Sequence, residues 1–106
     1  MKVLLDECLP LDLRHYLDKH EAHTVQWAGF KGKKNSDLMR SAEAAGYDVL
    51  ITVDQGLRHQ LPVGCEKLSI VMLRVRTNQI EDLLPLTELI LETLDSIQPR
   101  EVIAIP

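Results

Sequence analysis

The chain is poor in aromatic side chains, in cysteine and in long apolar segments. Its 106 residues include one Trp, two Tyr, one Phe and two Cys. Aliphatic side chains must therefore fill the core, and a scaffold held by several disulfides is excluded. No apolar run approaches the roughly 18 residues that span a bilayer. The start, Met1-Lys2-Val3, lacks the layout of a signal peptide, so we expect a cytoplasmic protein without a membrane partner.

A basic excess, which is common in nucleic-acid-binding domains, is also missing. The chain has 12 Lys and Arg against 16 Asp and Glu, a formal net charge of −4. This balance argues against a wide electrostatic footprint on nucleic acid. It is compatible with an enzyme whose acidic pocket holds cations, because bound metal ions reverse the local sign of charge. Cys8 and Cys65 are too far apart for a CxxC metal site, and we expect both to be free thiols.

What the chain does contain is a regular alternation of apolar and amphipathic segments. Short apolar runs predict strands at residues 3–5, 23–26, 48–53, 68–75 and 101–105. Helical spacing predicts a helix after Pro10 with Leu9, Leu13, Tyr16 and Leu17 on its apolar face, a helix from Asn35 or Ser36 to Gly46, and an apolar face over residues 80–97 that Pro85 interrupts. Alternating strands and helices predict an α/β fold, a three-layer sandwich around a mainly parallel central sheet. We expect residues 1–106 to form a single domain.

Acidic residues stand where two of these strands end. Asp6 and Glu7 follow the first strand and Asp54 follows the central strand, while Asp37 lies in the first turn of the helix after a basic loop. In parallel sheets ligands bind at the carboxyl ends of the strands. Each acid also has an ordinary explanation, as a helix-start charge, a turn residue or a solvated loop residue. Because two separate strands both end in an acid, we favour a common site.

Such a cluster needs compensation, since two carboxylates about 4 Å apart repel by about 4 kcal/mol at an effective dielectric of about 20. All-oxygen ligands suit Mg²⁺ or Mn²⁺. Two such ions form a clamp for phosphodiester hydrolysis. Several nearby residues fit contact with a phosphate backbone or support of the acids, although solvated surface charge is the alternative: Lys31, Lys33 and Lys34 in the loop at 28–35, Ser36, Thr52, Arg58, Arg74 and Arg76.

Three stretches, "LLDECLP", "NSDLM" and "VLITVDQGL", together resemble a short PIN-like family of predicted ribonuclease toxins from bacterial toxin–antitoxin pairs. The resemblance runs over nearly the whole chain in matching order. It implies a PIN-like fold, RNA as the substrate, a small antitoxin as the partner and Mg²⁺ or Mn²⁺ as the cofactor. It also implies metal ligation by Asp6, Asp37 and Asp54, with an assisting role for Glu7. We expect Glu7 to position a water or to cap the next helix.

Two departures from the family pattern bear on activity. Cys8 stands where the family usually has Asn, and Gln55-Gly56-Leu57 replaces a charged residue followed by an aromatic one. Because of these departures, a catalytically degenerate protein-binding module is kept open as an alternative. A histidine-based ribonuclease and a phosphoacceptor receiver domain are two further alternatives. The receiver needs a Lys after its last strand, but the last Lys here is Lys67. The apolar face at 80–97 can pack within the domain or across a homodimer.

Overall fold

The computed structural model describes residues 1–33, 35–53, 61–62, 64–75 and 79–105. Its centre is a five-stranded sheet in which every pairing is parallel, with the strand order β2-β1-β3-β4-β5. The strands are β1 (Lys2–Leu5), β2 (Glu21–Thr24), β3 (Val49–Thr52), β4 (Ser69–Leu73) and β5 (Val102–Ile105). The predicted α/β class with a parallel central sheet is confirmed. The three inner strands are mostly apolar because both of their faces are covered.

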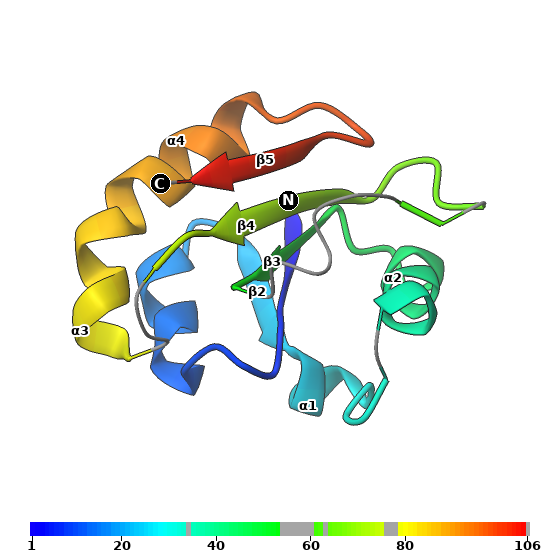
Figure 1. Cartoon of the computed structure of the whole chain (residues 1–106), viewed down its shortest axis with the longest axis horizontal. Helices are drawn as coiled ribbons and strands as arrows, with labels where there is room; N and C mark the ends of the chain where they lie inside the picture. Colours follow the sequence, from blue (N-terminus) through cyan, green and yellow to red (C-terminus); the bar gives the residue numbers. More distant parts are fainter. Residues whose placement is uncertain (34, 54–60, 63, 76–78, 106) are drawn as a thin grey trace.

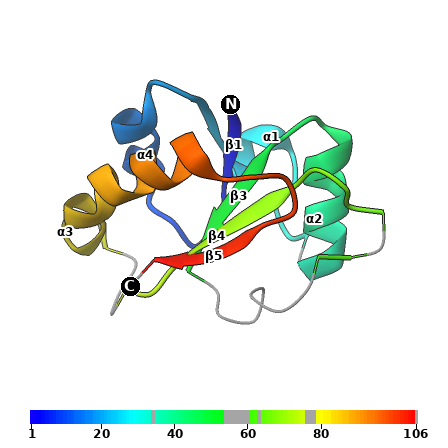
Figure 2. The ribbon, with the colours of Figure 1, turned by 90° about the horizontal axis from the view of Figure 1, so that it is seen from above.

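Helices cover both faces of the sheet. The 3-10 helix η1 (Leu11–Leu17), α3 (Ile80–Leu83), the short 3-10 turn η3 (Leu84–Leu86) and α4 (Thr87–Ser96) lie on one side, and α1 (Val25–Ala28) and α2 (Asn35–Ala44) on the other. Figure 1 shows the two groups apart, and the turned view in Figure 2 keeps α4 and α2 on opposite sides of the strands. Side chains alternate accordingly: Leu5, Ile51 and Val71 face the first group, and Leu4, Leu50 and Ile70 face the second. This is a three-layer arrangement.

The helices on the first side differ in detail from the sequence expectation. The helix after Pro10 is a 3-10 helix, and Tyr16, expected on its apolar face, is 45% exposed. A 3-10 helix has three residues per turn, so the positions that reach the core differ from those of an α-helix. Pro85 does interrupt the next segment, which divides into α3, η3 and α4. Among the described residues, no helix has the length and apolar character needed to cross a membrane.

The second strand was predicted two residues too late. It covers Glu21–Thr24, and the expected strand residues Val25 and Gln26 begin α1 instead. The reason is a helix cap, because the Thr24 hydroxyl accepts a hydrogen bond from the N–H of Trp27 at 3.1 Å. A Thr at the N-cap satisfies one of the free N–H groups of a helix start. The chain therefore turns immediately after β2.

The side chain of Glu43 ties α2 to the segment before β4. Its Oε2 accepts from the N–H of Glu66 at 2.7 Å, and its Oε1 accepts from the N–H groups of Lys67 and Leu68 at 2.8 Å each. Burial raises the pKa of the Glu43 carboxyl, but the three backbone donors and the Lys67 charge outweigh it and lower the pKa overall. The ionised form of Glu43 is therefore the one that holds this junction together.

Candidate active site

The strand order reverses beside β1, because β2 lies on one side of it and β3 on the other. In open parallel sheets the crevice for a ligand forms at such a switch point, outside the carboxyl ends of the strands. Asp6 is the first residue after β1, and its N–H donates to the carbonyl oxygen of Ile51 in β3 at 3.0 Å. The backbone thus places Asp6 at the carboxyl edge between these two strands.

A short hydrogen bond joins Asp6 to the last residue of β3. The Thr52 hydroxyl donates to Oδ2 of Asp6 at 2.6 Å, and the N–H of Glu7 donates to Oδ1 at 2.8 Å. Thr52 is fully buried, whereas Asp6 is half-buried. Support of a carboxylate is one of the roles that the sequence suggested for Thr52. Since a carboxylate has about four acceptor sites, the two bonds orient Asp6 and leave it able to accept more.

Cys8 lies beside this pair. Its Sγ is 4.0 Å from the Thr52 hydroxyl oxygen, and the residue is half-buried. Burial is the main cause that raises the pKa of the Cys8 thiol, and the negative charge of Asp6 adds to it. The thiol therefore stays protonated near neutral pH. Neither Cys8 nor Cys65 forms a disulfide bond within the described residues, as expected from the sequence.

The basic loop is held against the acidic residues by Glu7. The Glu7 carboxylate accepts a hydrogen bond from the N–H of Gly32 at 3.2 Å, across 25 positions of the chain. Lys31 and Lys33 flank this glycine and are exposed. Glu7 does not cap the following helix, which begins after Pro10 without a side-chain cap. Its carboxylate instead brings two lysines to the edge where Asp6 lies.

The other predicted site residues are only partly placed. Asp37 lies exposed in the first turn of α2, and the contacts described do not join it to Asp6 or Glu7. Its helix leads from the end of β2 to the start of β3, so its first turn belongs to the carboxyl edge. Within the described residues, no three His, Cys, Asp or Glu side chains come close enough to hold a metal ion. Several predicted residues lie outside the described part of the chain: Lys34, Asp54, Arg58, Arg76 and the stretch Gln55-Gly56-Leu57.

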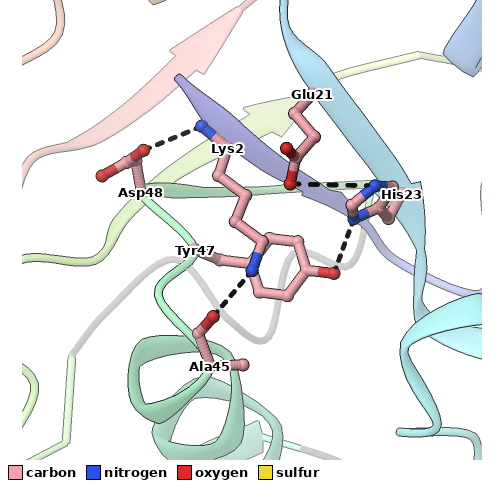
Figure 3. Close-up of polar contacts among 6 residues, drawn as sticks. All are labelled: Lys2, Glu21, His23, Ala45, Tyr47 and Asp48. Carbon is pink, nitrogen blue, oxygen red and sulfur yellow. Dashed lines mark hydrogen bonds and ion pairs between the residues drawn. The ribbon is translucent and has the colours of Figure 1, made fainter.

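Sequence reasoning missed a group of ring side chains around His23 of the outer strand β2. His23 stacks on Trp27 with ring centroids 3.9 Å apart, and its Nδ1 lies 2.9 Å from the Tyr47 hydroxyl. Figure 3 shows His23 between Tyr47 and Glu21, with the Lys2 side chain along the tyrosine ring. The sequence signal that pointed to this group was the position of the single Trp, four residues after a His and four before a Lys.

A shallow cavity lies at the opposite, amino edge of the sheet. It is lined by residues at the starts of β3 and β4 and in the turn after α4, among them Asp48, Lys67 and Gln98. The proposed acidic residues follow the strands, so this cavity is separate from them.

No protein-family profile matches the sequence, and searches of curated proteins and of solved structures found no match either.

Proposed function

We propose that this chain is a PIN-like, Mg²⁺- or Mn²⁺-dependent endoribonuclease. The observation that carries the proposal is the hydrogen bond between Thr52 and Asp6, made at the carboxyl edge where the strand order reverses. A buried hydroxyl that holds a half-exposed carboxylate is the kind of outer-shell support that metal-binding carboxylates have. The natural partner in this proposal is a small antitoxin protein that covers the acidic edge.

The chemistry of the donors at this edge fits a hard divalent cation. Asp6 offers carboxylate oxygens, Asp37 belongs to the same edge, and Asp54 follows Thr52 by two positions in the sequence. The Cys8 thiol is kept protonated and is a poor ligand for Mg²⁺. When bound, the metal supplies a Lewis acid for the phosphoryl oxygen and lowers the pKa of the attacking water.

In this proposal the chain itself orients the ligand and attracts the substrate. Thr52 fixes one oxygen of Asp6, and the carboxylate keeps further acceptor sites for a cation. Glu7 holds the loop through Gly32, and Lys31 and Lys33 attract the RNA backbone. The lysines also offset part of the acidic charge that would repel a polyanion.

The strand order alone does not separate the nuclease from a receiver domain, because the flavodoxin-like order 2-1-3-4-5 is found in receivers too. The position of lysine supports the nuclease over the receiver. Lys67 precedes β4 and therefore lies at the amino edge, away from Asp6. In β5, Val102–Ile105, no Lys is present. Within the described residues, the last strand therefore lacks the lysine that a receiver needs there, which favours the nuclease.

The test is cleavage of a labelled RNA by purified protein, with Mg²⁺ or Mn²⁺ and with EDTA. We expect metal-dependent cleavage that Asp6→Asn and Asp54→Asn each abolish while the variants keep their thermal unfolding transition. Asp95→Asn, on the exposed surface of α4, is the matched control and should cleave normally. Retained cleavage in both site variants would refute the carboxylate mechanism. If the parent protein neither cleaves RNA nor binds millimolar Mn²⁺ in calorimetry, the protein-binding module is the correct function.

A further inference from the structure

We propose that Trp27 is a stacking platform for a base of single-stranded RNA. This inference rests on the proposed ribonuclease function and names a contact of its substrate. Trp27 is the only Trp of the chain, and it is 70% exposed. One face of its indole is stacked on His23, at 3.9 Å between centroids and 29° between planes. The high exposure leaves the other face open to solvent, as base stacking requires.

The backbone of α1 and the stacked His23 ring hold the indole in place. The N–H of Trp27 donates to the Thr24 cap at 3.1 Å, which fixes the backbone of α1. His23, the ring beneath it, bonds Tyr47 at 2.9 Å and has Glu21 at 3.9 Å from its other nitrogen. Tyr47 is only 3% exposed, so this support belongs to the core. A rigid aromatic platform binds with less loss of side-chain entropy.

The helix that carries Trp27 starts at the same edge of the sheet as the acidic residues. Trp27 belongs to α1, which starts directly after β2, and Gly32 follows it by five positions. Five residues span at most about 18 Å, and Gly32 is bonded to Glu7. A strand of RNA that reaches Asp6 can therefore also reach Trp27. Between and beside these points lie the exposed side chains of Lys31 and Lys33.

The neighbouring charges favour nucleic acid over protein as the occupant. The centres of protein interfaces are depleted in lysine, whereas single-stranded nucleic acid sites combine aromatic platforms with cationic side chains along the backbone. Here two lysines follow the exposed indole within six positions. The His23 ring is already stacked on one face of Trp27, so a base placed on the open face continues a row of stacked rings.

The single Trp allows a direct test by fluorescence. A short oligouridylate is titrated into the full chain in EDTA, so that binding is measured without cleavage. We expect the indole emission to be quenched, because stacking against a base quenches it. Affinity is then measured by fluorescence anisotropy with a dye-labelled form of the same oligouridylate. Trp27→Ala should raise the Kd by about 5- to 150-fold, the range that alanine substitution of stacking aromatics gives. Trp27→Phe should restore most of the affinity. Tyr16→Ala, at an aromatic residue 45% exposed on η1, is the control and should bind normally.

The outcomes separate this inference from the proposed function. If RNA leaves the emission unchanged, or Trp27→Ala binds as the parent does while metal-dependent cleavage persists, the platform is refuted and the nuclease remains. If binding depends on Trp27 but no metal supports cleavage, the platform is supported and the nuclease fails. If sedimentation shows a dimer that Trp27→Ala converts to a monomer, this surface is an interface between copies and the platform is refuted.

Discussion

Replacement of Thr52 by Val removes the hydroxyl that orients Asp6 and keeps the branched shape of the side chain. Thr52 is fully buried, and its donated bond to Asp6 is short, at 2.6 Å. A hydrogen bond to a charged acceptor contributes about 1.5–3 kcal/mol, and loss of an outer-shell partner costs about 10- to 100-fold in metal affinity or activity. The energy range and the fold-change range agree, because a tenfold change in affinity or rate corresponds to about 1.4 kcal/mol. We therefore expect Mn²⁺ affinity and RNA cleavage to fall by about 10- to 100-fold.

The assay combines Mn²⁺ calorimetry, RNA cleavage rates and urea unfolding of the same variant. Asp6 is half-buried, so water can replace the lost donor, and we expect the free energy of unfolding to fall by no more than about 1.5 kcal/mol. Thr52→Ser should restore both metal binding and cleavage. Thr93→Val removes a hydroxyl that donates to a carbonyl within α4 and serves as the control. A Thr52→Val variant that binds Mn²⁺ and cleaves RNA like the parent would refute the positioning role.

Two further predictions concern stability and thiol chemistry. Glu43→Ala should lower the free energy of unfolding by about 1–3 kcal/mol in urea, because it removes the acceptor of three backbone N–H groups. The pKa of Glu43 is lowered in the folded state, so the stability that its carboxylate contributes should be full above the ordinary pKa of 4.5. That stability should be lost as the pH falls through the lower pKa of the folded state. A difference in the free energy of unfolding between the parent and Glu43→Gln that stays constant down to pH 2 would contradict this. Burial and Asp6 raise the pKa of Cys8, so iodoacetamide should alkylate it more slowly at pH 8 than it alkylates glutathione. An equal or faster rate would show that the thiol is not shielded.

The inner strands could be predicted from sequence because their apolar runs are long enough to be buried on both faces. All five residues of β4 are buried, and so are the four of β3. The edge strand β2 was placed wrongly, because its sequence, EAHT, has no apolar run and only its last residue is buried. There Thr24 both ends the strand and caps α1, and no periodicity distinguishes those two roles. Local capping therefore decided a boundary that hydrophobic pattern alone could not.

The site was predictable as a set of acids at one edge, but its contacts depend on strand register. Glu7 reaches Gly32 across 25 positions, and Asp6 reaches Thr52 across 46. Both faces of β1 and β3 are apolar, so burial does not by itself choose between registers that differ by one residue. Sequence reasoning therefore named Thr52 without naming its partner.

The amino edge of the sheet supplies the missing constraint on register. The N–H of Lys2 donates to Oδ2 of Asp48 at 2.8 Å (Figure 3). The N–H of Asp48 donates in turn to the carbonyl oxygen of Lys2 at 2.7 Å, so two hydrogen bonds pair these residues. Asp6 follows Lys2 by four positions, as Thr52 follows Asp48. Because parallel strands advance equally, pairing at the amino edge brings Asp6 to Thr52 at the carboxyl edge. A slip of one residue would turn the Thr52 hydroxyl to the other face of the sheet, so the Lys2–Asp48 pair supports the register that orients Asp6.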